Sequence, residues 1–370
     1  MAIYKARNRP NSGWTEISIE NIRKGKKIMK LKFRFIMTGL TWLGIAVSGG
    51  EPVPVSEPEF DEVKKAAGIL LNSDCMKESL RDSEAQKILQ AALDRITPEE
   101  YVRFCQRGVD ISTEELIKIY REHPAFYWYD TAFEKVLNEV RSESVVPGEV
   151  KLWLVYNMGY IVKSPTHCFC IDLHHRRAKE LVPYLEFALV THNHGDHYTR
   201  DFLTAMNEQG KKVYSAFFPS YGGYSKEPER VLRLADDLTI HVFESDHNRF
   251  LLRFVTPFEI VCKTGSEECV IFHSGDSCNA QQLHPKSAKV DFHIVHPRVG
   301  LDVRESARDT VKPDVTLISH LLEFHHKFDR FRWSFTVGYE EAEKVRSVGR
   351  TAYVPMWGEK IVWRKESGAK

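Results

Sequence analysis

The sequence predicts an α/β protein in which a helical segment precedes a strand-rich domain. Two capping boxes, Thr97-Pro-Glu-Glu100 and Ser112-Thr-Glu-Glu115, each begin a stretch with helical periodicity. After the turn residues Val146-Pro-Gly148, short apolar runs bounded by turn residues replace that periodicity. One of these runs, residues 187–190, leads directly into a dense group of histidines and an aspartate. We therefore expect the chemistry to lie in the second, strand-rich part of the chain.

The composition is that of an ordinary globular protein, and it excludes some classes of partner. The chain has 370 residues, 42% of them apolar, with 52 basic and 51 acidic residues. This length allows one large domain or two smaller ones. The balanced charge gives no global signature for nucleic acid or an anionic membrane, so no nucleic-acid partner is expected. Seven cysteines without a Cys-x-x-Cys pair predict free, mostly buried thiols.

Residues 1–58 are predicted to be a tail and linker, ending in a Pro-rich connector. Residues 1–28 are polar and show little pattern. A basic stretch then precedes the apolar run 35–47, and small residues follow it, as in a secretory signal peptide that begins at Met29. The signal predicts an exported or periplasmic protein; the alternative is a buried element in a cytoplasmic one. The run is too short to predict a membrane span, so membrane contact is expected only through residues 29–47, if they are retained.

Residues 59–146 are predicted to form a helical module. The expected helices, marked by apolar periodicity and capping boxes, cover residues 60–71, 82–96, 97–108, 112–120 and 126–140. The cluster Phe126-Tyr-Trp-Tyr129 is expected to be core, and a wall of a substrate entrance is the alternative.

Residues 147–370 are predicted to form the second domain, which is rich in strands. The strand signals cover residues 150–156, 160–162, 167–172, 187–190, 212–215, 238–243, 251–255, 258–263, 269–273, 291–295, 315–319, 352–355 and 360–363. Helices are expected at residues 179–184 and 339–348.

The motif His192-x-His194-x-Asp196-His197 is the strongest indication of function. Imidazole and carboxylate are the ligand types that suit zinc and related metals. Because the motif follows an apolar strand, its loop can turn alternate side chains inward, so that His192 and His194 serve one metal and Asp196 and His197 a second. A polar surface turn that happens to be rich in histidine is the alternative.

Three further candidate ligands come later in the chain. His247, Asp276 and His320 each follow closely after a predicted strand, as the first motif does. A metal site assembled at one edge of stacked sheets requires ligands at such positions.

These residues, taken together and in order, resemble the motifs of the metallo-β-lactamase-fold hydrolases. The resemblance covers about residues 149–365, and Asn157-Met-Gly159, Ser274-Gly-Asp276 and Trp357-Gly-Glu359 also look like this family. It implies a four-layer αββα sandwich, here with an N-terminal helical module, and a site at one edge of the two sheets. Asp276 stands where the lactamases proper use other ligands. The pattern is closer to the lactonase, phosphodiesterase and N-acyl-phosphatidylethanolamine phospholipase D branches.

The resemblance implies two divalent metal ions, each with three ligands, and one bridging ligand: His192, His194 and His247; Asp196, His197 and His320; and Asp276 as the bridge. Zinc is the expected metal, and manganese or iron would fit the same ligands. A hydroxide between the metals would attack a phosphorus or carbonyl centre, and Asp196 is expected to be catalytic because it can also hold the hydroxide's proton. The predicted enzyme is a dinuclear hydrolase that cleaves a phosphodiester, lactone or ester bond in a small-molecule or lipid-like substrate.

Three more residues are candidates for contact with the substrate. His296 and Arg298 follow the predicted strand 291–295 and would suit an anionic group, with a surface loop as the alternative. His325 is the third candidate, and either it or His326 could replace His320 as the last metal ligand. Two other functions remain open: an RNase Z-like nuclease and a non-catalytic binding protein on the same fold.

Overall fold

The computed structural model describes residues 2–7, 16–21, 54–78, 80–221, 230–326 and 331–364. The chain divides into two units between Val53 and Pro54. The first contains an antiparallel hairpin of β1 (Ala2–Arg7) and β2 (Glu16–Asn21), where the sequence predicted no element. The apolar run predicted as a signal peptide lies outside the described residues. In the described part of the chain, no helix is both long and apolar enough to cross a membrane.

The second unit begins with the five predicted helices. They are α1 (Glu57–Leu71), α2 (Glu84–Asp94), α3 (Pro98–Gln106), α4 (Thr113–Glu122) and α5 (Ala125–Ser142). The capping box of α3 is complete, because Thr97 accepts from the Glu100 backbone and the Glu100 side chain accepts from the Thr97 backbone. The Ser112 hydroxyl caps α4 in the same position. The capping residues in the sequence therefore predicted the starts of α3 and α4 correctly.

Two mixed sheets follow. The six-stranded sheet has the order β15-β3-β4-β5-β6-β7 and the seven-stranded sheet the order β14-β13-β12-β11-β10-β9-β8. The strands of the first are β15 (Lys360–Arg364), β3 (Glu149–Tyr156), β4 (Gly159–Lys163), β5 (Cys168–Ile171), β6 (Phe187–Leu189) and β7 (Lys212–Tyr214). Those of the second are β14 (Thr351–Tyr353), β13 (Val315–Ile318), β12 (Phe292–Val295), β11 (Glu267–His273), β10 (Phe258–Thr264), β9 (Leu238–Val242) and β8 (Arg230–Ala235).

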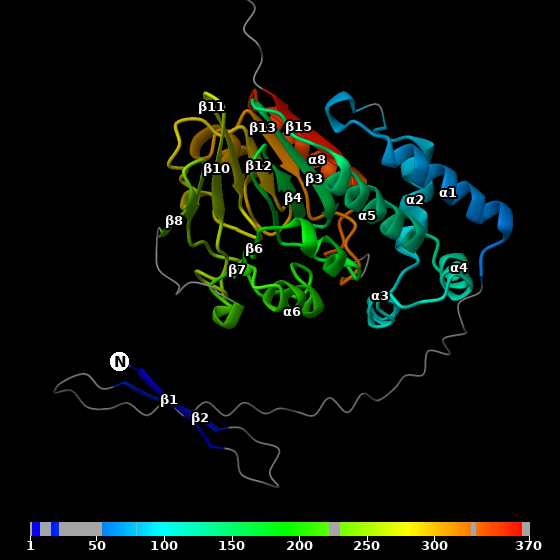
Figure 1. Ribbon diagram of the computed structural model, residues 1–370, viewed down its shortest axis with the longest axis horizontal. Coiled ribbons are helices and arrows are strands. Elements are labelled where there is room, and N and C mark those ends of the chain that lie inside the picture. Colours follow the sequence, from blue (N-terminus) through cyan, green and yellow to red (C-terminus); the bar gives the residue numbers. More distant parts are fainter. Residues whose placement is uncertain are drawn as a thin grey trace, which may run out of the picture. The chain divides into compact units, whose positions relative to one another are not determined.

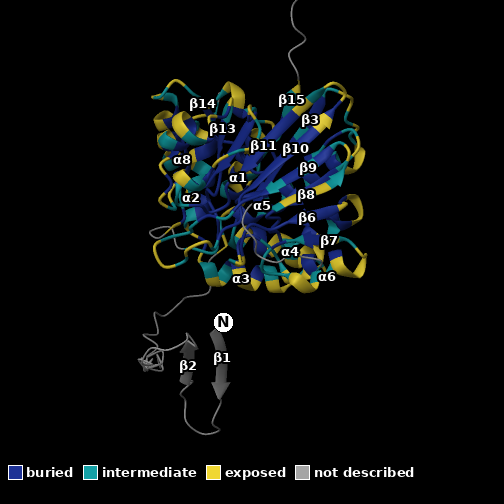
Figure 2. Ribbon diagram, turned by 90° about the vertical axis from the view of Figure 1, so that its left-hand side faces the viewer, coloured by how far each residue is buried: buried dark blue, intermediate teal, exposed yellow. Residues whose placement is uncertain are grey.

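Helices cover the outer faces of both sheets, which gives the predicted four-layer αββα sandwich. Helix α5 packs on β3, and α6 (Arg200–Glu208) packs on β7. Helix α8 (Phe335–Arg346) packs on β13 and β14. Figure 1 shows α1, α2 and α5 together along one side of the strands. In Figure 2 the central strands are mostly buried, while the helices expose their outer faces. The predicted fold class is confirmed by these layers.

Strand direction brings the loops that carry the candidate site together. Strands β5, β6 and β7 are parallel, and so are β11, β12, β13 and β14. Strand β9 runs with β11, because both are antiparallel to β10. The carboxyl ends of β6, β9, β11 and β13 can therefore supply side chains to one edge of the sandwich.

The predicted strand at residues 251–255 is wrong. This segment belongs to a loop with two isolated bridges, between Ser245 and Val255 and between Asn248 and Leu251. The Asn248 side-chain oxygen accepts from the backbone nitrogens of Phe250 and Leu251, which closes a turn. Local side-chain bonds of this kind compete with strand pairing. Helix α6 and the half-buried strand β8 were not predicted from the sequence.

The interior contains the aromatic cluster of α5 and most of the cysteines. Phe126, Trp128 and Tyr129 are buried, and Trp128 stacks on Trp357 with ring centroids 4.4 Å apart. The cluster is therefore core and not the wall of an entrance. All seven cysteines are free thiols and five of them are buried, as predicted.

Candidate metal centre

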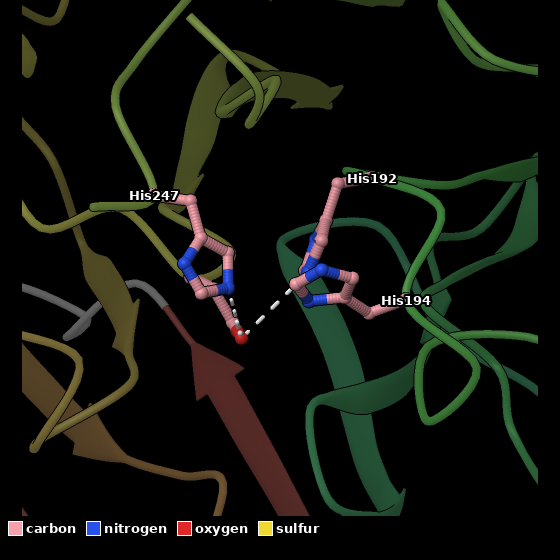
Figure 3. Close-up of side chains that lie close together, drawn as sticks. His192, His194 and His247 are labelled. Carbon is pink, nitrogen blue, oxygen red and sulfur yellow. Dashed lines mark ion pairs between the residues drawn. The ribbon is translucent and has the colours of Figure 1, made fainter. Parts of the chain in front are cut away.

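The structure brings all seven predicted ligands together at the shared edge of the two sheets. They come from four loops: His192, His194, Asp196 and His197 after β6, His247 after β9, Asp276 after β11, and His320 after β13. Figure 3 shows the rings of His192, His194 and His247 converging from two of these loops.

The seven side chains fall into two groups, and Asp276, a member of the first, also forms a group with His296 and His320. One ligand atom from each of His192, His194, His247 and Asp276 lies within 4.8 Å of the others, and the same holds for Asp196, His197 and His320. The Asp276 Oδ2 atom is 3.7 Å from His192 Nε2, 3.5 Å from His247 Nε2 and 3.7 Å from His320 Nε2. Its Oδ1 atom is 3.3 Å from His197 Nε2. This carboxylate therefore faces both groups.

Several of these atoms lie near opposite charges but make no hydrogen bond of good geometry. Among the described residues, the Nε2 atoms of His192, His197 and His320 and the Oδ1 atom of Asp276 are buried and make no hydrogen bond. A buried polar atom without a partner costs about 1–3 kcal/mol. Cations placed between the imidazole and carboxylate groups would satisfy these atoms, and the donor set suits zinc, manganese or iron. The residues present thus fit bound divalent metal.

The electrostatics of the cluster favour metal binding at the first group. Burial, reinforced by the neighbouring His197, holds the pKa of His192 well below its usual value, so this imidazole is neutral and able to bind a metal. Burial alone would raise the pKa of Asp276. The surrounding imidazoles, His197 and His320 first, outweigh burial and hold that pKa well below its usual range. The Asp276 carboxylate is therefore ionised.

In the second group, nearby carboxylates determine the direction in which the pKa of His197 shifts. Burial alone would lower the pKa of His197, but Asp276, Asp196 and Asp172 outweigh it and raise that pKa well above its usual value. This concentration of negative charge attracts protons when no other cation is present. A divalent ion would compete with those protons for the same nitrogen atoms.

A further carboxylate, Asp172, orients the first motif. It follows β5, and its Oδ2 atom lies 2.9 Å from His197 Nδ1 and accepts from the Thr191 hydroxyl at 2.7 Å. Its Oδ1 atom accepts from the Thr191 backbone nitrogen at 2.8 Å. Because Nδ1 of His197 is held by a carboxylate, its Nε2 lone pair is directed into the cluster.

Three residues at this edge have left-handed backbone conformations. The φ angles of Asn157, Asp172 and His320 are 55°, 47° and 57°. Such conformations cost roughly 1–2 kcal/mol for residues other than glycine and cluster at functional sites. The His320 backbone nitrogen donates to the Asn157 carbonyl at 3.1 Å, which joins β13 of one sheet to β3 of the other. Asn157 Nδ2 also lies 3.2 Å from Asp196 Oδ2.

The structure separates two of the predicted substrate-binding residues. The His296 ring is buried and stacks on His320 with centroids 3.8 Å apart, so it lies against the cluster. The Arg298 guanidinium instead pairs with Glu340 at 2.8 Å and Glu341 at 2.7 Å, both on α8. Its charge is already balanced, and these contacts give no support to the predicted role in binding an anion.

The loop after His320 contains a buried acid, Glu323, that was not among the predicted site residues. Glu323 is fully buried and accepts from the backbone nitrogens of His325 and His326, at 2.7 and 3.0 Å. It also lies 2.6 Å from His326 Nδ1. The His325 ring packs edge-on against His174 and Tyr101, with centroids 4.7 and 5.1 Å away.

Neither His325 nor His326 takes the place of His320 in the second group. The group of Asp196 and His197 is completed by His320, whose Nε2 atom lies 3.1 Å from Asp196 Oδ2. His326 belongs to a separate group with Asp196 and Glu323. Asp172 stands just after a strand, and Glu323 stands shortly after the predicted ligand His320. These positions are the one sequence signal that could have identified the two acids.

Comparisons with known proteins give matches at the level of structure alone. No protein-family model and no curated protein sequence matches this chain. The chain is similar to the metallo hydrolase Igni18 from the archaeon Ignicoccus hospitalis, with 18% identity and a TM-score of 0.46 over 59% of this chain and 100% of that one. It is also similar to an isothiocyanate hydrolase from Delia radicum gut bacteria, with 16% identity and a TM-score of 0.42 over 57% and 98%.

A third similar structure is CmlA, a diiron β-hydroxylase from Streptomyces venezuelae, with 14% identity and a TM-score of 0.44. That match covers 74% of this chain and 63% of CmlA. The fold itself is defined by the two mixed sheets between outer helices, with a histidine and aspartate cluster at their shared edge. This architecture is the four-layer αββα sandwich with an edge site that the resemblance to the metallo-β-lactamase-fold hydrolases implies.

Proposed function

We propose that this protein is a dinuclear metal-dependent hydrolase that cleaves a phosphodiester, lactone or ester bond in a small-molecule or lipid-like substrate. The proposal rests mainly on one observation. Seven imidazole and carboxylate groups converge at one edge of the sheets, and several of their buried nitrogen and oxygen atoms make no hydrogen bond. When bound, two divalent cations would supply Lewis acidity and make a water molecule more acidic. Zinc is the expected metal, with manganese or iron as alternatives.

Asp196 is proposed to orient the attacking water. Its carboxylate is buried and belongs both to the second metal group and to the group formed with Glu323 and His326. Asn157 donates to its Oδ2 atom at 3.2 Å, which fixes the plane of the carboxylate. An ionised carboxylate held in this way can accept a hydrogen from the attacking water while it binds a metal.

An apolar wall beside the first group supports substrates with an apolar substituent. The Phe254 ring lies 5.2 Å from His194 and 5.8 Å from His192, measured between centroids, and 5.1 Å from Phe217. On the same loop, Phe250 is 78% exposed. An aryl or acyl group could rest on these rings while the scissile bond faces the metals.

Metal analysis followed by a substrate screen tests the proposal. The purified protein should contain close to two metal ions per chain and should hydrolyse at least one of p-nitrophenyl phosphodiesters, lactones and lipid phosphodiesters. His194→Ala removes a ligand of the first group, so it should lose metal and reduce turnover to the background rate. His284→Gln alters an exposed histidine outside the cluster and should change neither.

Two outcomes would reject the proposal. Full turnover in His194→Ala would refute the assignment of the site. A protein that carries no metal, and whose fold and stability do not respond to a chelator, would favour a non-catalytic binding protein. Cleavage of RNA in place of the small substrates would favour an RNase Z-like nuclease.

A further inference from the structure

We infer that Glu323 and His326 form a proton-donating pair, in which Glu323 positions the His326 imidazole and His326 Nε2 protonates the leaving group. This inference rests on the proposed hydrolase function and adds a specific residue to it. None of the seven ligand positions is used by this pair, so its role can be tested separately from metal binding.

The pair stands beside the reacting centre. One oxygen of Asp196, one oxygen of Glu323 and one ring nitrogen of His326 all lie within 4.8 Å of one another. Both residues are on the loop that follows β13 and carries His320. The imidazole is thus next to the second metal group, on the side of the cluster that Asp196 occupies.

The orientation of His326 is fixed by a fully buried carboxylate. Glu323 Oε1 lies 2.6 Å from His326 Nδ1, and two backbone nitrogens donate to the same carboxylate. Burial would raise the pKa of Glu323, but the hydrogen bonds from His325 and His326 outweigh it and lower that pKa to about 2. An ionised acid that accepts from Nδ1 holds the ring in one orientation and stabilises the imidazolium form.

The other ring nitrogen is available to a substrate. With Nδ1 engaged by Glu323, Nε2 is the nitrogen left to donate, and the His326 side chain is 42% exposed while its partner is buried. The loop itself is anchored, because the buried Arg332 donates to the Glu323 carbonyl at 2.8 Å and to the Leu93 and Ile96 carbonyls at 2.9 and 2.8 Å. A partly exposed donor on an anchored loop is what general acid catalysis requires.

Proton transfer from His326 accompanies cleavage of the bond to the leaving group. The oxygen of water forms a bond to phosphorus or to the carbonyl carbon and gives one proton to Asp196, which later releases it to solvent. The bond from that centre to the leaving oxygen breaks. The electron pair of the broken bond goes to the leaving oxygen, which takes the proton from His326 Nε2. The ring is left neutral with its proton on Nδ1, still bonded to Glu323, and it recovers a proton from solvent.

The leaving group therefore provides the test. An alkoxide leaves poorly without a proton, whereas p-nitrophenolate leaves readily without one. His326→Gln should reduce kcat for an alkyl phosphodiester or alkyl ester by about 100-fold or more, and for the matched p-nitrophenyl substrate by only a few fold. Glu323→Gln should give the same pattern with a smaller loss, because the ring remains but is less well oriented. His284→Gln is the control and should behave as the parent enzyme.

Metal content separates this inference from other roles of the pair. His326→Gln should keep the same number of bound metal ions as the parent. Equal losses on both substrates, or a lower metal content in His326→Gln, would overturn the inference, and the latter would make His326 a metal ligand. If Glu323→Gln does not fold, the His326→Gln variant still tests the inference, because the His326 side chain is partly exposed. Absence of hydrolysis by the parent enzyme would instead reject the proposed function.

Discussion

Asp172 shows how a single residue outside the ligand set can control the metal centre. Its carboxylate holds the Thr191 backbone and the His197 ring at once, with contacts between 2.7 and 2.9 Å. In Asp172→Asn, one oxygen can still accept from Thr191. The new amide would donate to His197 Nδ1, which forces the histidine proton onto Nε2, the atom that faces the metals.

We therefore expect Asp172→Asn to lower zinc affinity by about 10–100-fold with a smaller effect on stability. Titration of the metal-free protein with zinc, followed by calorimetry, measures this. Asp237→Asn is the matched control, because Asp237 faces the His167 ring at 2.8 Å and neither residue is in the cluster. An unchanged affinity in Asp172→Asn, or an equal loss in Asp237→Asn, would contradict the assigned role.

For single residues, site members in an unusual local pattern could be predicted from the sequence, whereas site members without such a pattern could not. Three histidines and an aspartate within six positions stand out, and the structure brings them together as expected. A lone acid such as Asp172 or Glu323 has no such pattern. Arg298 was predicted to bind an anionic substrate because its partners on α8 cannot be recognised in the sequence. They lie more than 40 residues later and are adjacent to Arg298 only in the folded chain.

At the scale of elements, the turn after β11 depends on a glycine. Gly275 has a φ angle of 53°, and a Cβ atom there would lie 2.8 Å from two Thr191 side-chain atoms and 2.9 Å from Val255 Cγ1. Thr191 is held by Asp172, so it cannot move away freely. Close packing at Gly275 thus places Asp276 against the loop that carries the first motif.

Gly275→Ala should destabilise the fold by about 2–4 kcal/mol, combining the left-handed backbone with the steric overlap, and should weaken zinc binding by displacing Asp276. Gly265→Ala provides the comparison: its φ angle is 67° but nothing lies within 4 Å of the added atom. That variant should lose only about 1–2 kcal/mol and keep its zinc affinity. Urea unfolding measures both, and similar losses in the two variants would remove the steric argument.

Helices were easier to predict than strands because their signals are local. Thr97 and Glu100 satisfy each other's backbone within one turn, so the start of α3 is encoded in four residues. Residues 251–255 form a short, mostly apolar run like that of a strand, yet Asn248 closes a turn that takes them out of the sheet. Strand pairing depends on distant partners, which a local pattern cannot specify.

At the scale of the whole molecule, the helical segment and the sandwich pack as one body. Arg332 lies in the last part of the chain and donates to carbonyls at the end of α2. Gln86 of α2 donates to the Tyr339 hydroxyl of α8 at 2.7 Å. The sequence predicted the helices and the site but not these contacts, since the residues are about 240–250 positions apart. Cooperative unfolding of the two parts is the physical consequence.

Such a closely packed interior also contains histidines whose pKa values lie far below that of an exposed imidazole. Burial lowers the pKa of His293 on β12 to about 3. Burial, reinforced by His325, lowers the pKa of His174 to about 3 as well. Unfolded histidine titrates near pH 6.5. Between that value and pH 3 the unfolded chain binds protons that the folded chain excludes, so acid favours unfolding and the free energy of unfolding rises with pH.

His293→Gln should therefore flatten the pH dependence of stability. Each excluded proton contributes a slope of up to about 1.4 kcal/mol per pH unit below pH 6.5, and the variant lacks one of them. Urea unfolding at pH 7, 6 and 5, with chelator present so that metal release adds nothing, gives the slope for parent and variant. His284→Gln removes an exposed imidazole and should keep the slope of the parent. Since His293 packs edge-on against Phe272, the variant can be less stable at pH 7, and only the slope decides. A slope equal to that of the parent would show that His293 takes up its proton in the folded protein.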